Sequence, residues 1–417
     1  MPSTRPDRPA MLAAVAATTV LVLAGCSLDP APAGPAATGA ASGTRVAPEA
    51  ARGIAALLDR RAAAVRRGDA AAYGRGVGGS RARQDRWFDN VVQLPASTVG
   101  FSLEPASLVR DGDGWWGTVR VELRLRGYDA MPVVTRDRYR FVRDGRRFRV
   151  TSMTDAAWER RNRVQPQPWD LERVVVRERA GVLGMFDAGS ADRADELVSA
   201  VADAVATIGP RLPIAWDGRV VVYALSDPAF VSGLEGVPGG DPLAVDGLAF
   251  PVVAGPDGAG ASEVASTRVV LNPRILSVPE ASRDRLLRHE LVHVALGERD
   301  DRIPVWLSEG LAEYLSVQTL PTSERLVPAE ALTAARRGLS ALPDGETFNG
   351  PASQANYGVA WWVCEAVAET WGEQMLWTLV EELDGVADPV RRLEQLLGVD
   401  EQRLLDDAAR MMLATYS

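Results

Sequence analysis

The chain contains two histidines, and they stand four residues apart in the segment His289-Glu290-Leu291-Val292-His293. On an α-helix a step of four residues turns through about 400°, so both imidazoles project from one face, about one turn apart. Two neutral imidazoles placed in this way can hold one metal ion, most commonly zinc, with Glu290 beside them as a base toward an activated water. The chain must therefore form a helix here and pack a third metal ligand against it.

The third ligand must be acidic, because no other histidine exists and a catalytic zinc ion usually has three protein ligands. We expect Glu309, since a break between Gly297 and Pro304 lets a second helix fold against the first. Glu313 lies one helical turn later and faces the same way, so it can accept a hydrogen bond from a ligand imidazole. The alternative ligands that stay open are Glu313, Asp300, Asp301 and Glu298.

Two motifs together carry a resemblance to a known family. His289-Glu290-x-x-His293, followed by Trp306-Leu307-Ser308-Glu309-Gly310-Leu311-Ala312, resembles the gluzincin zinc metallopeptidases, and most of all the bacterial peptidase MA-like domains. The resemblance covers residues 170–417. It implies one Zn²⁺ per chain with Glu309 as third ligand, and Glu313 as a carboxylate supporting the site from outside. The metzincin pattern is absent, because Leu296 and Arg299 stand where it requires glycine and histidine.

The resemblance implies hydrolysis of peptide bonds by a metal-activated water, with Glu290 as general base. In related gluzincins a tyrosine beyond the third ligand stabilises the tetrahedral intermediate, and Tyr357 is our candidate; the alternative is a core aromatic. A peptide substrate can bind as an added strand along a sheet edge, at 247–253 or 267–271. We expect Trp361, Trp362, Tyr314 and Cys364 to be core residues.

Two other functions compete with this one. The chain can be a catalytically silent lipoprotein scaffold or binding module that retains a metallopeptidase fold. Alternatively, residues 47–160 can be the functional centre and bind a small ligand. The intact Glu290 favours hydrolysis over the scaffold. The net charge of −9 gives no indication of a nucleic-acid partner.

The N-terminus predicts export. Arg5 and Arg8 precede an apolar run of 13 residues, Met11–Leu23, which is too short to span a membrane. The run ends in Leu23-Ala24-Gly25-Cys26, which resembles a bacterial lipoprotein signal; the alternative is an ordinary secretory signal. The resemblance implies a signal peptide at 1–25, lipid on Cys26, and a chain anchored to the outer face of the bacterial cell membrane. Residues 26–46, rich in Pro, Ala, Gly and Ser, predict a flexible linker.

The remaining patterns predict an α+β fold. In residues 47–160 a helix at 48–67 precedes strands, with alternation from Val119 to Leu125 and a hairpin turn at Asp144-Gly145. This order resembles an NTF2-like cone, and Arg143, Arg146, Arg147 and Arg149 fit a solvated sheet face. Further on we expect a helix at 191–208, a metal-binding helix capped near Ser282 that ends near Gly297, a helix after Pro304, and mostly helices from about 323 to 416. The expected strands are 173–177, 219–225, 247–253 and 267–271.

Overall fold

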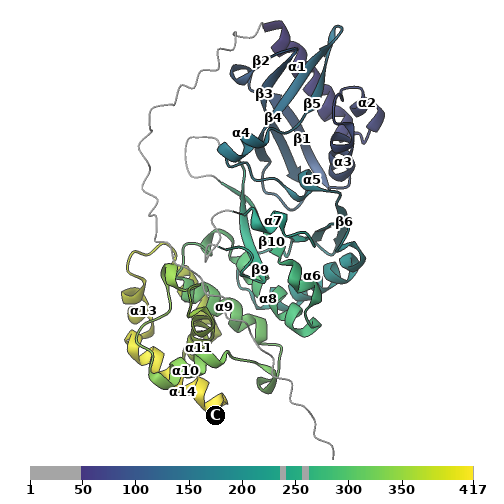
Figure 1. The fold of residues 1–417 in the computed structure, drawn as a ribbon. Helices are drawn as coiled ribbons and strands as arrows, with labels where there is room; N and C mark the ends of the chain where they lie inside the picture. Colours follow the sequence, from purple (N-terminus) through teal and green to yellow (C-terminus); the bar gives the residue numbers. More distant parts are fainter. Residues whose placement is uncertain (1–47, 235–240, 256–262, 417) are drawn as a thin grey trace, which may run out of the picture.

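The computed structural model describes residues 48–234, 241–255 and 263–416 of the chain. Within these ranges the fold is α+β, as predicted. Figure 1 shows a sheet with helices at the top, a second sheet in the middle and a helical part below. The predicted signal segment 1–25, the lipidated Cys26 and the linker 26–46 lie outside the described residues. Among the helices of the described ranges, none is long and apolar enough to span a membrane.

The first part consists of helices followed by antiparallel strands: α1 (Pro48–Arg66), α2 (Ala70–Gly74), α3 (Arg81–Val91), β1 (Ala96–Leu103), β2 (Val109–Asp111), β3 (Gly114–Leu125), β4 (Val133–Asp144) and β5 (Arg147–Ser152). The strands form a curled sheet in the order β1-β3-β4-β5, with β2 paired to β3. Val119, Leu123 and Leu125 are buried in one core with α1 and α3, as the alternation predicts. The predicted hairpin is confirmed, because Asp144 pairs with Arg147 around a glycine with φ of 60°.

The second sheet follows two short connecting helices, and its elements are α4 (Ala156–Arg161), α5 (Pro168–Leu171), β6 (Val175–Arg179), β7 (Val182–Phe186), α6 (Ala194–Ile208), β8 (Val220–Ala224), α7 (Ala229–Ser232), β9 (Gly247–Val253) and β10 (Val264–Leu271). Its strand order is β6-β7-β8-β10-β9. Strand β8 pairs in parallel with β7 and β10, whereas β6 and β9 are antiparallel to their neighbours. The expectation that 267–271 can offer a sheet edge is therefore wrong, since β10 lies between β8 and β9.

This middle sheet separates two hydrophobic cores. Val220 and Val222 pack into a core with α6 and the helices that follow, whereas Val221 and Tyr223 pack into the core of the first part. Successive side chains of a strand point to opposite faces, so each strand contributes to both cores. All residues of β7 and β8 are buried as a result.

The metal-binding helix is α8 (Glu280–Leu296). It begins two residues before Ser282, so the predicted cap is wrong. Pro279 occupies the N-cap position instead, and its carbonyl accepts hydrogen bonds from the backbone of Ser282 and Arg283 at 3.1 Å, which starts the helix earlier. The helix ends at Leu296 with Gly297 as its C-cap, which agrees with the predicted end near Gly297. The helices that follow are α9 (Val305–Val317), α10 (Ala329–Arg337), α11 (Ser353–Trp371), α12 (Glu373–Glu382), α13 (Pro389–Leu397) and α14 (Glu401–Tyr416).

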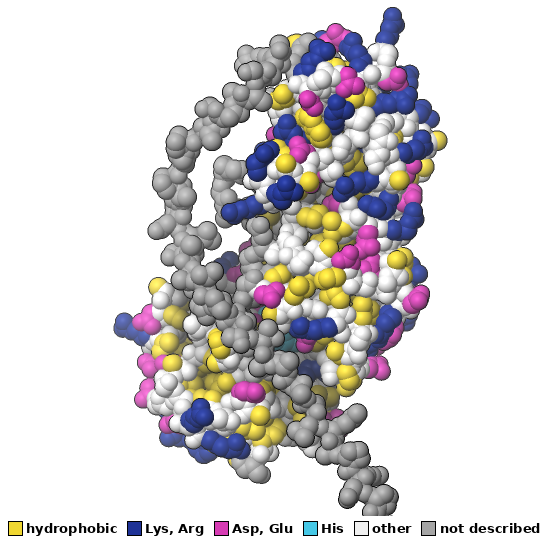
Figure 2. Space-filling view, viewed as in Figure 1, with side chains coloured by type: hydrophobic (Ala, Val, Ile, Leu, Met, Phe, Trp, Pro, Cys, Tyr) yellow, Lys and Arg dark blue, Asp and Glu magenta, His cyan; other side chains and the backbone are white. Residues whose placement is uncertain are grey.

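The predicted core residues of this helical part are confirmed. Trp361, Trp362, Tyr314 and Cys364 are all buried. The arginines of the first sheet also lie as predicted, on a solvated face. Arg143 pairs with Glu49 at 2.8 Å, and Figure 2 shows cationic and anionic side chains interspersed over this upper part.

Candidate metal centre

Two helices bring three ligand-type side chains together. His289 and His293 lie one turn apart on α8, and Glu309 comes from α9, which packs against it. The Nε2 atoms of the two histidines are 3.2 Å apart. The Oε2 atom of Glu309 lies 3.2 Å from Nε2 of His289 and 3.4 Å from Nε2 of His293. Three buried donor atoms therefore converge on one point.

The position of α9 depends on local backbone features. Gly297 ends α8 with φ of 59°, a conformation that favours glycine, and the chain turns back toward Pro304, where α9 begins. Gly310, next to Glu309, lies against the backbone of α11, where an added Cβ would stand 2.5 Å from the carbonyl oxygen of Ala360. This close approach holds the Glu309 turn of α9 against α11.

Carboxylates face the opposite nitrogen of each imidazole. Nδ1 of His293 lies 2.9 Å from Oδ1 of Asp300 and 3.2 Å from the hydroxyl of Ser308, which also donates to Asp300. Nδ1 of His289 lies 3.4 Å from Oε1 of Glu313, and Glu313 is ion-paired with Arg285. The acceptor beside Nδ1 of His293 favours the proton there and leaves a lone pair on Nε2, whereas Nδ1 of His289 makes no hydrogen bond within the described residues. The Nε2 atoms of both rings face Glu309.

The electrostatics of this cluster favour bound positive charge. Burial alone raises the pKa of the Glu309 carboxyl, but His293 and His289 outweigh burial, so this pKa lies well below its usual range. Burial lowers the pKa of His293, yet Asp300 and Glu309 hold this pKa well above its usual value. Oε2 of Glu309 has no hydrogen-bond partner among the described residues. A metal cation at the convergence point would satisfy all three atoms.

Glu290 also lies at the candidate metal centre, but its carboxylate is not one of the three converging groups. Its side chain is buried, and burial raises its pKa, although His289 and His293 lower it. It accepts a hydrogen bond from the backbone of Ala249 on β9. An added Cβ on Gly247 would stand 2.8 Å from Oε1 of Glu290, so a larger residue there would displace this carboxylate. Strand β9 therefore positions this carboxylate.

Tyr357, from the second turn of α11, lies beside the cluster. Its ring centroid is 6.2 Å from that of His289, and its hydroxyl donates to Oδ1 of Asn349 at 3.1 Å. Burial raises the pKa of this hydroxyl well above its usual value, and Glu309 and Glu290 raise it further. The tyrosine thus keeps its proton, and its side chain lines the cleft.

The other acidic candidates for the third ligand take different positions. Asp300 contacts the far side of His293, and Glu313 the far side of His289. Asp301 is exposed, and Glu298 lies 3.8 Å from Arg302. None of the four belongs to the cluster of converging atoms found in the described part of the chain. The sequence reasoning missed the contact of Ser308 with His293, although this serine directly precedes Glu309 in the second motif.

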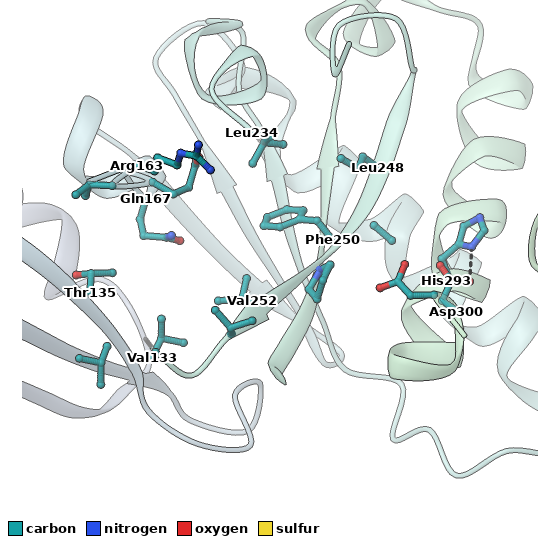
Figure 3. A pocket seen from close by; sticks show the side chains of 18 of the residues that line it. Val133, Thr135, Arg163, Gln167, Leu234, Leu248, Phe250, Val252, His293 and Asp300 are labelled. Atoms are coloured by element: carbon teal, nitrogen blue, oxygen red, sulfur yellow. Dashed lines mark hydrogen bonds and ion pairs between the residues drawn. The ribbon is translucent and has the colours of Figure 1, made fainter. Parts of the chain in front are cut away.

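The cluster opens into one large cleft. The cleft has a volume of about 840 Å³ and contains His289, Glu290, His293, Glu309 and Tyr357 at one end. Figure 3 shows His293 and Asp300 at this end, joined by their interaction, and residues of the first part of the chain at the other. In the space-filling view, histidine surface is visible only as a small area between the middle and lower parts (Figure 2). The site is thus reached through the cleft.

Comparison with known proteins gave no match to any family model, curated protein or solved structure.

Proposed function

We propose that the protein is a zinc-dependent metallopeptidase of the gluzincin type, with His289, His293 and Glu309 as metal ligands and Glu290 as general base. One observation carries the proposal. The two Nε2 atoms and Oε2 of Glu309 form a triangle with edges of 3.2, 3.2 and 3.4 Å. A tetrahedral zinc ion with ligands at 2.0–2.1 Å requires edges of about 3.3 Å.

The composition of the site also fits zinc. Two imidazoles and one carboxylate are a common catalytic zinc set, which leaves a fourth position for water or substrate. Asp300 and Glu313 would orient the imidazoles from behind, as carboxylates commonly do for zinc-bound histidines. Calcium and magnesium prefer sites made of oxygen ligands, so two imidazoles argue against them.

The mechanism assigns a task to the residues at the metal end of the cleft. A zinc ion held by His289, His293 and Glu309 would lower the pKa of a bound water molecule and polarise the scissile carbonyl. Glu290 takes a proton from the attacking water and passes it to the leaving amine, a role that suits a buried carboxylate whose pKa is raised. The hydroxyl of Tyr357 donates a hydrogen bond to the oxygen that gains negative charge. Asp300, through His293, and Gly247, through Glu290, act as positioning residues.

The Glu290→Gln substitution tests this proposal. Glutamine has the same shape but cannot accept the proton, so hydrolysis of a diverse peptide mixture should fall by about 10²–10⁴-fold while zinc stays bound. His289→Ala should lose both zinc and hydrolysis. Identical cleavage products from wild type and Glu290→Gln would contradict the proposal and favour the silent scaffold.

We also propose that the chain is exported and lipid-anchored through Cys26, with an NTF2-like first domain. The signal-like segment ending at Cys26 and the curled sheet of residues 96–152 support this. Cys26→Ala should move the protein from the membrane fraction into the medium or periplasm. A Cys26→Ala variant that stays with the membrane would contradict the lipid anchor.

A further inference from the structure

The cleft extends from the candidate metal centre to the first part of the chain. At its far end lie Val133 and Thr135 of β4, together with Arg163 and Gln167 from the segment around α4 and α5. Figure 3 shows these side chains opposite His293, with Phe250 and Val252 between the two ends. The far end of the cleft is therefore built by residues outside the two metal-site helices.

Strand β9 forms the floor that joins the two ends. At its start, Gly247 lies against Glu290. Just beyond its end, the carbonyl of Ala254 accepts a hydrogen bond from the backbone of Val134 at 2.8 Å. A strand rises about 3.3 Å per residue, so the seven residues of β9 cover about 20 Å. Among the described strands β9 pairs with β10 alone, so it is the edge strand of the sheet, and on its outer edge the N–H of Ala249 is bonded to Glu290.

An apolar trough lies along this floor. Leu248, Phe250 and Val252 alternate along β9 and so share one face, opposite to the face on which Gly247 meets Glu290. Leu234 and Val133 complete the trough from neighbouring segments, and all five residues line the cleft. The middle of the cleft is thus suited to an apolar side chain, one to three residues along β9 from the Ala249 contact of Glu290.

The far wall is fixed relative to the metal centre. Asp129, in the loop before β4, forms an ion pair of 2.8 Å with Arg268 of β10, and both side chains are at most 1% exposed. The backbone of Ala130 also donates to Ala265 at 2.7 Å. Separating the two parts would leave buried charges without partners, which is strongly unfavourable. The first domain is therefore a permanent wall of the cleft.

We propose that the first domain is part of the substrate site. An extended peptide runs along the outer edge of β9, and an apolar side chain one to three residues from the scissile bond occupies the trough between Val133 and Phe250. The spacing follows from the strand positions of Phe250 and Val252, about 3 and 10 Å along β9 from Ala249. The inference rests on the proposed function, because it takes the peptide to be a substrate. It makes these two residues determinants of substrate specificity.

Peptide binding to the Glu290→Gln variant tests this without turnover. Two fluorescent octapeptides, one with leucine and one with aspartate at these positions, are titrated against the zinc-loaded protein. We expect the leucine peptide to bind at least about tenfold more tightly, a typical effect of filling an apolar pocket. Adding Val133→Arg should abolish the difference, whereas adding Val92→Arg, at a valine 40% exposed and outside the cleft, should preserve it. Phe250→Ala should reduce the difference in affinity between the two peptides, because it removes an apolar side chain of β9 from the trough. Thermal unfolding verifies that each variant is folded.

The outcomes separate this inference from the proposed function. Equal binding of the two peptides, or unchanged discrimination in folded Val133→Arg and Phe250→Ala, would overturn the trough even if the wild type cleaves peptides in a Glu290-dependent way. Tighter binding of the leucine peptide, with no cleavage of either peptide by the wild type, would support the trough and contradict the proposed hydrolysis.

Discussion

Replacing Asp300 by alanine should weaken zinc binding without touching a metal ligand. Oδ1 of Asp300 lies 2.9 Å from Nδ1 of His293, so it fixes the imidazole and directs the lone pair of Nε2 toward the centre. Loss of such a partner typically costs 10- to 100-fold in metal affinity. The hydroxyl of Ser308, 3.2 Å from the same nitrogen, can still accept its proton. We therefore expect about a tenfold loss, equivalent to about 1.4 kcal/mol, for Asp300→Ala.

Removing Ser308 as well takes away this second acceptor. The double variant Asp300→Ala/Ser308→Ala should therefore lose about a hundredfold in zinc affinity, the upper end of that range. The dissociation constant of zinc is measured by competition with a chromophoric chelator. Asp301→Ala is the matched control, because it removes the same negative charge from the next residue, whose side chain is exposed. Equal zinc affinities of Asp300→Ala and Asp301→Ala would refute the reasoning, since the loss would then come from net charge alone.

Three further predictions follow from individual contacts. Gly247→Ala should lower peptide hydrolysis at least about tenfold with zinc retained, because its Cβ would stand 2.8 Å from Oε1 of Glu290 and displace the base; full activity would contradict this. Tyr357→Phe should lower kcat about 10²–10³-fold with little change in KM, as loss of an oxyanion donor does; an unchanged kcat would leave Tyr357 a core residue bonded to Asn349. Burial, with help from neighbouring acids, raises the pKa of Asp137 from 3.8 to about 8. Between these two pKa values the folded state holds a proton that the unfolded state has lost. The contribution of Asp137 to the free energy of unfolding is therefore complete below pH 4 and disappears as pH rises to about 8. Asp137→Asn should therefore raise Tm at pH 9 relative to wild type more than at pH 4, and a gain independent of pH would contradict the assignment.

The sequence was most informative where a local pattern decides the structure. The spacing of His289 and His293 places both on one helical face, and the glycine and proline that delimit the break lead to a second helix carrying Glu309. The structure brings all three together. The role of Asp300 could not be read in the same way. A turn at Gly297–Arg299 directs its carboxylate behind His293, and turn geometry is not evident from spacing.

Nonlocal features were the ones that sequence reasoning missed. Strand β7 escaped notice because Val182–Phe186 is buried on both faces and shows no polar alternation. The edge position of β9 depends on the order of strands in the sheet, which no single strand encodes. The ion pair between Asp129 and Arg268 joins residues 139 positions apart, and it fixes the far wall of the cleft. These features determine how the cleft is built.

Zinc content tests the central claim most directly. The wild-type protein is loaded with zinc, dialysed and purified, and its metal content is measured by mass spectrometry. The variants His289→Ala, His293→Ala and Glu309→Ala are treated and measured in the same way. We predict one zinc ion per wild-type chain and a large loss of zinc in each variant. Wild-type protein without a bound divalent ion, or variants that retain the full zinc content, would contradict the metal centre and the function built on it.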